Sequence, residues 1–265
     1  MIKTKYLLYA FKYKEKQKYT YWYETDQKFF RANKPTTKSV LDKCIEEREF
    51  INQEDIIDNP WIEWKSNDIQ KIIASNGVSI NYLKSTNHNH IQKQEDLKLL
   101  EMYSYLVENF DTSKSFGFNT VKKWHKEIFR SIYPFAGDLR SVEMAKGTDE
   151  EAWTWQLSFL NGIPDLNTII KQVSSSDYED INSLTKDLSQ VICDFLFIHP
   201  FREGNGRLSR LLCDIILAKN GLPMIGLNLK SGDNYIERVH DGYQCNYKPM
   251  QELLKIKIKE EIKNE

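Results

Sequence analysis

The part of the sequence best equipped for chemistry is residues 199–210, which read His-Pro-Phe-Arg-Glu-Gly-Asn-Gly-Arg-Leu-Ser-Arg. Gly204 and Gly206 allow the backbone to adopt positive φ and to approach a ligand closely, so successive N–H groups can converge on an anion. Arg207 and Arg210 add forked positive charge, which matches phosphate oxygens better than a lysine does. The run therefore predicts a phosphate-handling catalytic loop.

A carboxylate and an imidazole in the same run extend this prediction. Glu203 would repel a phosphate unless a hard cation lay between them, so its presence indicates a metal-bound polyphosphate. The side-chain amide of Asn205 could bind the same cation or phosphate. His199 is the candidate general base, because an imidazole with an unperturbed pKa of about 6.5 can take a proton from a hydroxyl near neutral pH.

Apolar residues recur with helical spacing on both sides of the run. They are Leu184, Leu188, Val191, Ile192, Phe195 and Leu196 before it, and Leu208, Leu211, Leu212, Ile215 and Ile216 after it. The loop is therefore expected to join two buried helices. The N-terminus of the second helix would favour a bound anion.

The run resembles, position for position, the His-x-Phe-x-(Asp/Glu)-Gly-Asn-Gly-Arg-x-x-Arg signature of the Fic family, whose best-known members transfer AMP from ATP to protein hydroxyls. Residues 124–129 and 133–140 look like the helix and turn that precede the family's β-hairpin flap. Residues 235–243 and 247–249 are similar to the segment that closes the adenine pocket. The resemblance covers roughly residues 95 to 255 and implies a mainly α fold: a Fic-type helical bundle with a small β-hairpin flap.

The resemblance also implies a reaction and a role for individual residues. The activity would be Mg²⁺- and ATP-dependent transfer of AMP to a Tyr, Thr or Ser hydroxyl of a target protein, with release of pyrophosphate. His199 would deprotonate the hydroxyl, and Glu203 would hold Mg²⁺ on the α- and β-phosphates. Arg207 would grip the outer phosphates, and Arg210 would brace the loop or the γ-phosphate. The flap at 141–147 would pair with an extended segment of the target by strand addition.

The residues expected to contact the nucleotide come from three segments. They are Arg202, Gly204, Asn205, Gly206, Arg207 and Arg210 in the loop; Ser141, Val142, Glu143, Met144, Lys146 and Gly147 in the flap; and Tyr235 and Tyr243 beside the adenine. Simple core packing competes for the two tyrosines, because Ile236 and Val239 share their amphipathic helix. Arg210 could also be structural, since it lies a turn into its helix.

Two alternative functions stay open. Relatives of this fold with an altered loop transfer phosphate or phosphocholine, which makes a Fic-fold kinase or other phosphotransferase the alternative enzyme. The intact residues 204–207 favour AMP transfer, because their anion site suits the α-phosphate of ATP. The other alternative is a nucleic-acid- or protein-binding regulator, in which the aromatic and basic residues near the N-terminus stack on single-stranded nucleic acid. A solvated strand face explains those residues better, so nucleic acid is an unexpected partner.

Regulation is less clearly written in the sequence. Many family members block ATP with a helix carrying (Ser/Thr)-x-x-x-Glu-(Gly/Asn), and residues 104–109 match this loose pattern, with Glu108 as the glutamate. They fall in the first core helix, too late for an N-terminal inhibitory helix. The better-placed segment, residues 75–80, has Ser79 where the glutamate belongs. We expect either no internal brake or one supplied by a separate small antitoxin-like protein.

The chain as a whole looks like an ordinary enzyme of the cytoplasm. Its 265 residues carry a formal net charge of -1, which gives no nucleic-acid or membrane signal. Four cysteines without metal-ligand spacing fit a reducing compartment. No apolar stretch approaches the roughly 20 residues that span a bilayer, and the N-terminus lacks a signal-peptide layout. A bacterial effector exported without a cleaved signal would look the same.

Residues 1–90 show no such resemblance and are expected to form an N-terminal extension, with the Fic domain at 91–265. Apolar and polar residues alternate over 5–14 and 19–24, which predicts a short β-hairpin in the extension. His88 and His90 have no carboxylate or cysteine at ligand spacing, so a polar loop is favoured over a metal site. His125, beside Trp124, is expected to be a structural helix residue.

Overall fold

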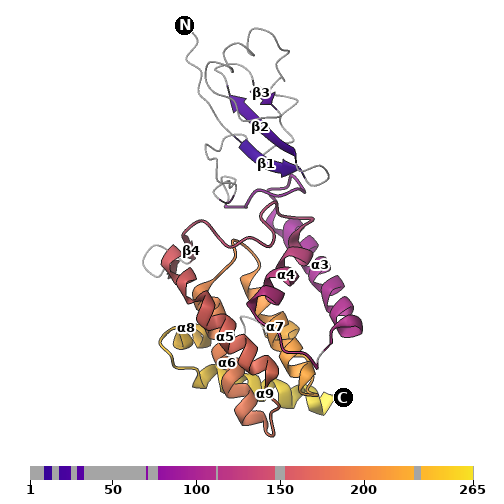
Figure 1. Ribbon diagram of the computed structural model, residues 1–265, viewed down its shortest axis with the longest axis vertical. Helices are drawn as coiled ribbons and strands as arrows, with labels where there is room; N and C mark the ends of the chain where they lie inside the picture. Colours follow the sequence, from indigo (N-terminus) through magenta and orange to yellow (C-terminus); the bar gives the residue numbers. More distant parts are fainter. Residues whose placement is uncertain are drawn as a thin grey trace. The chain divides into compact units, whose positions relative to one another are not determined.

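The structure, a computed structural model, describes residues 9–13, 18–24, 29–32, 70, 77–111, 113–146, 153–229 and 234–264 (Figure 1). The chain divides into two compact units. One consists of Met1–Lys98 with Phe129–Ala136, and the other of Leu99–Ile128 with Gly137–Glu265. The sequence boundary expected near residue 90 stays a prediction.

The first unit contains a three-stranded antiparallel sheet. Strand β2 (Lys18–Glu24) lies between β1 (Tyr9–Tyr13) and β3 (Phe29–Ala32), with Tyr9 opposite Trp22 and Glu24 opposite Phe29. The hairpin predicted from alternation is therefore confirmed. The third strand was not predicted.

In the first unit, hydrogen bonds connect the turn at 129–136 with the segment before helix α3 (His88–Asn109) and with the first part of that helix. The Tyr82 N–H donates to the Ile132 carbonyl at 2.8 Å, and the Tyr133 hydroxyl donates to Glu95 at 3.0 Å. Ser79 is buried, and its carbonyl accepts from the Asn81 amide at 3.0 Å. Position 79, where the inhibitory pattern would have a glutamate, is thus a buried serine.

The second unit is helical, as the fold prediction required (Figure 1). Its helices are α4 (Phe118–Phe129), α5 (Ile163–Ser175), α6 (Ile181–Ile198), α7 (Asn205–Lys219), α8 (Tyr235–Tyr243) and α9 (Lys248–Asn264), with short turns η2 (Leu157–Gly162) and η3 (Gly226–Asn228). Helix α6 packs against α5, α7, α8 and α9, so it forms the centre of the unit.

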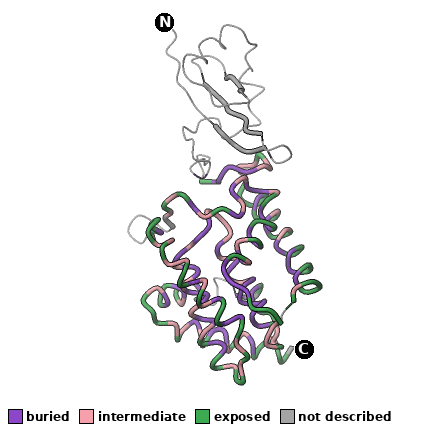
Figure 2. Tube along the Cα trace, viewed as in Figure 1, coloured by how far each residue is buried: buried purple, intermediate pink, exposed green. Residues whose placement is uncertain are grey.

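The apolar faces of α6 and α7 are buried as their spacing predicts (Figure 2). Leu188, Val191 and Ile192 on α6 and Leu208 and Leu212 on α7 have no exposed surface. Helix α6 begins at a side-chain cap, in which the Asp180 carboxylate accepts from the Asn182 and Ser183 N–H groups. These two buried helices hold the predicted loop between their ends.

A buried carboxylate joins three elements of the same unit. The Tyr103 hydroxyl of α3 donates to Asp214 of α7 at 2.6 Å. The other Asp214 oxygen accepts from the Ile225 and Gly226 N–H groups, at 2.7 and 2.6 Å, at the start of η3. Because three hydrogen bonds satisfy this carboxylate without solvent, they fix these elements around α7.

The flap is an antiparallel hairpin of β4 (Met144–Lys146) and β5 (Trp153–Trp155), with Met144 opposite Trp155. The hairpin itself was predicted, but its second strand lies beyond the predicted flap at 141–147. Gly147 and the residues up to 152 lie outside those described. Of the helices that the structure does describe, none combines the length and apolar character needed to cross a bilayer.

Candidate active site

The site begins where α6 ends. His199 caps the helix in the left-handed conformation, with φ 50° and ψ 62°, and Pro200 follows it. This backbone conformation is uncommon for a residue with a side chain. It is held from both sides, because the His199 N–H donates to the Phe195 carbonyl at 2.9 Å and the His199 carbonyl accepts from Arg140 at 2.7 Å.

Arg140 is the buried hub of a hydrogen-bond network, although the sequence indicated only a residue at the end of a turn. It is 2% exposed, and its guanidinium donates to five main-chain carbonyls. The acceptors are those of Val142, Trp155, Gln156, Ile198 and His199. Burial lowers the pKa of Arg140, but arginine begins so high that it stays protonated. A positive charge thus sits at the C-terminus of α6, where the helix dipole favours it.

The imidazole of His199 has a defined orientation. Its Nδ1 lies 3.2 Å from the Leu196 carbonyl, and the Trp155 indole lies against its face with ring centroids 4.1 Å apart. Because a carbonyl can only accept, Nδ1 carries the proton and the lone pair of the neutral ring is on Nε2. A base with its lone pair on Nε2 is what proton abstraction from a hydroxyl requires.

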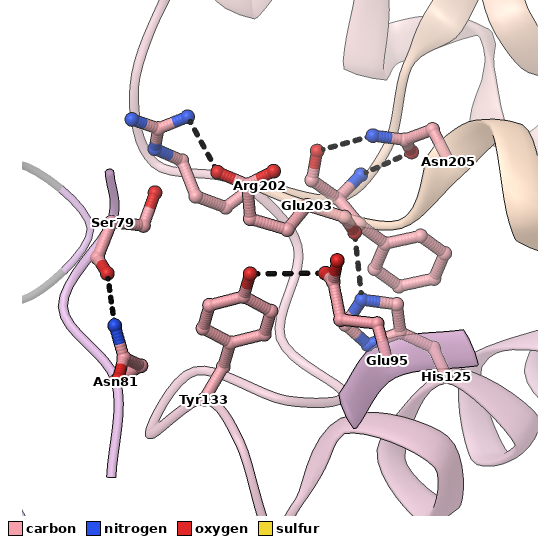
Figure 3. Close-up of polar contacts among 9 residues, drawn as sticks. Ser79, Asn81, Glu95, His125, Tyr133, Arg202, Glu203 and Asn205 are labelled. Carbon is pink, nitrogen blue, oxygen red and sulfur yellow. Dashed lines mark hydrogen bonds and ion pairs between the residues drawn. The ribbon is translucent and has the colours of Figure 1, made fainter. Parts of the chain in front are cut away.

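His125 contacts the signature loop at two of its residues, Phe201 and Glu203. Its ring lies on that of Phe201, with centroids 3.9 Å and planes 9° apart, and both residues are fully buried. His125 Nδ1 accepts from the Gly137 N–H at 2.8 Å, so Nε2 carries the proton and donates to the Glu203 carbonyl at 3.1 Å (Figure 3). Burial lowers the pKa of His125 to about 4, which keeps the ring neutral. The structural role expected of His125 agrees with this geometry.

The side chain of Asn205 is used inside the loop. It is 2% exposed, its Oδ1 accepts from the Phe201 N–H at 2.9 Å, and its Nδ2 donates to the Phe201 carbonyl at 2.7 Å (Figure 3). Both polar atoms of the Asn205 amide therefore pair with one residue of the loop, and its service to a cation or phosphate stays a prediction. The backbone N–H of Asn205 stays part of the predicted anion site.

That anion site lies at the N-terminus of α7. Gly204 caps the helix with φ 83°, and the Leu208 N–H makes the first intrahelical bond, to the Gly204 carbonyl at 2.9 Å. The N–H groups of residues 205–207 therefore precede the helical ladder, where an anion can accept from them. Arg207 and Arg210 are half-buried on the same helix. The donor set consists of N–H groups and guanidinium groups, and so fits a polyphosphate.

Glu203 is the carboxylate of the site and is partly exposed. Its Oε1 lies 3.6 Å from the Arg202 guanidinium (Figure 3). Within the described ranges, no group of three or more His, Cys, Asp or Glu side chains could hold a metal. A single carboxylate is nevertheless a suitable protein ligand for Mg²⁺, which keeps water and phosphate oxygens as its other ligands. The residues thus fit Mg²⁺ bound with a nucleotide rather than a protein cage.

The predicted nucleotide contacts in the flap differ in how far they are exposed. Ser141 and Glu143 are exposed and Val142 and Met144 half-buried, whereas Gly147 and the side chain of Lys146 lie outside the described part of the chain. Their contacts with a nucleotide stay predictions.

The two tyrosines of α8 have different surroundings. Tyr235 is 3% exposed, and burial raises its pKa to about 12, against the opposing effects of Arg210 and Ser209 on α7. The Tyr243 hydroxyl donates to the Leu196 carbonyl at 3.3 Å. Such burial of Tyr235 is what the core-packing alternative requires. Contact of Tyr235 and Tyr243 with a nucleotide stays a prediction.

Residues 115–217, which contain the whole of this loop and the flap, match the model of the Fic/DOC family. The segment is therefore a Fic/DOC domain, and the resemblance read from the sequence is confirmed.

Two curated relatives carry adenylyltransferase names. The chain is 26% identical over 125 residues to protein adenylyltransferase VbhT of Bartonella schoenbuchensis, covering 45% of this chain and 26% of the relative. It is 29% identical over 87 residues to probable protein adenylyltransferase y4lH of Sinorhizobium fredii, covering 31% of this chain and 43% of the relative. The chain thus spans less than half the length of either.

Solved Fic domains share the fold at low identity. The N-terminal FIC domain of Bep8 from Bartonella sp. 1-1C aligns with a TM-score of 0.60 and 12% identity, covering 69% of this chain and 91% of that one. BepC from Bartonella tribocorum, solved with bound AMPPNP, aligns with a TM-score of 0.56 and 14% identity, covering 68% of this chain and 91% of that one. Both support the helical architecture.

Proposed function

We propose that the chain transfers AMP from ATP to a Tyr, Thr or Ser hydroxyl of another protein. The observation that carries the proposal is the imidazole of His199, whose Nδ1 is directed to the Leu196 carbonyl, in the same loop that leads into the N-terminus of α7. The Fic/DOC domain and the names of its adenylyltransferase relatives support this reaction over others.

The residues of the loop have complementary parts in this reaction. Nε2 of His199 takes the hydroxyl proton as the oxygen attacks the α-phosphorus, and the bond from that phosphorus to the bridging oxygen breaks, so pyrophosphate leaves. The N–H groups at the start of α7 and the guanidinium of Arg207 stabilise the charge that develops on the phosphates. Glu203 is the ligand proposed for Mg²⁺, which when bound would neutralise phosphate charge.

Labelled ATP tests the reaction type. AMP transfer places label on protein from ATP labelled at the α-phosphate and none from ATP labelled at the γ-phosphate. A kinase gives the opposite result. Intact-mass spectrometry of the protein with ATP and Mg²⁺ would detect self-modification by one AMP unit, which provides an assay before a target is known. Label arriving only from the γ position would contradict the proposal.

Two substitutions separate the proposed roles. His199→Ala should lower the rate of transfer by about 10²- to 10⁴-fold, the usual contribution of a general base, and leave ATP affinity near that of the wild type. Arg207→Ala should instead weaken ATP binding, because it removes a phosphate contact. His90→Ala, an exposed histidine at the start of α3, is the matched control and should change neither. Retained transfer in His199→Ala would remove His199 from its role.

The target is proposed to dock on the flap. Because β4 and β5 pair only with each other among the described residues, each has an outer edge that an extended segment could join by strand addition. Main-chain pairing reads little sequence, so the hydroxyl would be selected by position. A separate antitoxin-like protein is the proposed brake.

A further inference from the structure

The Leu196 carbonyl, at the end of α6, lacks its usual helical hydrogen-bond donor because a proline occupies position 200. In an α-helix the Leu196 carbonyl would accept from the N–H of residue 200, but that residue is Pro200, which has no N–H. A buried carbonyl needs another donor. The sequence His199-Pro200 therefore creates an acceptor directly beside the proposed base.

Three side chains from three elements converge on this oxygen. The Trp155 Nε1–H of β5 lies 3.0 Å from it, the Nδ1 of His199 3.2 Å, and the Tyr243 hydroxyl of α8 3.3 Å. Trp155 is only 6% exposed, and its indole also covers one face of the imidazole at a centroid distance of 4.1 Å and an angle of 30°. The indole and the imidazole are thus positioned by the same atom and by each other.

Arg140 also connects the backbone of Trp155 with that of His199. Arg140 donates from Nη1 to the Trp155 carbonyl at 3.1 Å and from Nε to the His199 carbonyl at 2.7 Å. Its Nη2 joins the Gln156 and Ile198 carbonyls at 2.6 and 3.3 Å. The second flap strand and the end of α6 are therefore joined through one guanidinium, which holds the backbones that carry the indole and the imidazole next to each other.

We propose that Trp155 is a positioning residue for His199. Its indole lies against one face of the imidazole and keeps the Nδ1 proton directed to the Leu196 carbonyl. This inference rests on the proposed function, because it concerns the base of that reaction. It makes the flap part of the apparatus that orients the base, as well as the surface where a target would dock. Without the indole, the ring can rotate, and Nε2 then no longer holds its lone pair where the hydroxyl arrives.

Two substitutions at position 155 separate the stacking from the hydrogen bond. Trp155→Phe keeps an aromatic ring and removes the N–H, whereas Trp155→Leu removes both. Phe110→Leu is the matched control: it deletes an aromatic ring of the same unit whose contacts are Phe116 and Trp124. Thermal unfolding of all three establishes that the variants are folded and how much each is destabilised.

The first measurement does not require AMP transfer. In ¹⁵N-histidine-labelled protein above pH 8, with His199 assigned by its loss in His199→Ala, the wild type should show the Nδ1–H tautomer and a ring proton shifted upfield by the indole. Trp155→Leu should lose the upfield shift and move toward the Nε2–H tautomer, and Trp155→Phe should keep most of the shift. Signals of His199 that are unchanged in Trp155→Leu, or equally changed in Phe110→Leu, would overturn the proposal.

The second measurement is the rate of AMP incorporation at saturating ATP. Trp155→Leu should lower it by up to about 100-fold without changing the KM for ATP, because misplacement of a catalytic group by about 1 Å can cost this much. Trp155→Phe should lie between it and the wild type. A response of the His199 signals in a protein that transfers no AMP would keep the positioning role and refute the reaction. Normal transfer by Trp155→Leu would refute the positioning role alone.

Discussion

The imidazole of His125 lies flat on the ring of Phe201, 3.9 Å away, and donates from its edge to the carbonyl of Glu203. A neutral ring is required there, because Nδ1 accepts from the Gly137 N–H. Protonation would turn this acceptor into a donor facing a donor. The signature loop is therefore coupled to the protonation of a residue 78 positions away in the sequence.

This relationship predicts a dependence of stability on pH. Burial lowers the pKa of His125 to about 4 in the folded protein, below the value of about 6.5 in the unfolded chain. The unfolded chain therefore binds the proton first as the pH falls, and stability is lost between pH 6.5 and 4. The loss from this residue should be about 2 kcal/mol between pH 7.5 and 5.

Urea unfolding of the wild type and His125→Gln at both pH values checks this. The variant is expected to be less stable at pH 7.5, because it loses the stack on Phe201, but its stability should fall less on acidification. His90→Gln, an exposed control, should follow the wild type. An equal fall in wild type and His125→Gln would contradict the assignment of the pH dependence to His125.

The five hydrogen bonds of Arg140 lead us to expect that a positive charge at this position is not sufficient for stability. Arg140→Lys keeps the charge but cannot reach five carbonyls with three donors on one nitrogen. Because buried carbonyls that lose their donors cost about 1 to 3 kcal/mol each, we expect Arg140→Lys to lower the free energy of unfolding by about 3 kcal/mol or more. Urea unfolding measures this directly. Arg130→Lys, on an exposed residue, should change stability by less than about 0.5 kcal/mol, and equal effects of the two would be inconsistent with the hub.

The contrast between Arg140 and the signature shows what the sequence could and could not predict. The helices α6 and α7 were predictable because burial of one face imposes a period on side-chain types. Arg140 and Trp155 were not, because their acceptors are main-chain carbonyls up to 59 residues away, and every residue has a carbonyl. The pairing of the Asn205 amide with Phe201 could not be predicted for a related reason: an amide suits a ligand or a loop, and only the loop geometry shows this contact.

Glu108 offers a test of self-inhibition. It is exposed near the end of α3, and no ion pair with Arg210 is found among the residues that the structure describes. We therefore expect Glu108→Ala to leave the rate of AMP incorporation within about twofold of the wild type, since surface substitutions seldom disturb a distant site. A rise of tenfold or more would show that Glu108 restrains the enzyme. The comparison is made at ATP concentrations below KM, where relief of a block on ATP binding is most visible.

The two glycines of the signature should fail for different reasons when replaced by alanine. Gly204 has φ 83°, a conformation that costs a residue with a side chain roughly 1 to 2 kcal/mol, so Gly204→Ala should lower the free energy of unfolding by about that amount. At Gly206 a Cβ atom would lie 3.3 Å from Arg210 Nη1, the far end of a flexible side chain. Gly206→Ala should therefore shift the guanidinium by a few tenths of an ångström and hardly change stability, since alanine suits a helix better than glycine.

Urea unfolding and ATP titration of both variants separate these effects. Gly206→Ala should weaken ATP binding several-fold at near wild-type stability, and Gly204→Ala should show a loss of stability even without ATP. In Gly206→Ala, combination with Arg210→Ala provides the decisive control, because an effect transmitted through Arg210 cannot add to its removal. If the two substitutions weaken ATP binding additively, the Cβ atom must act on the nucleotide by another route, and the proposed part of Arg210 in holding the nucleotide would lose this support.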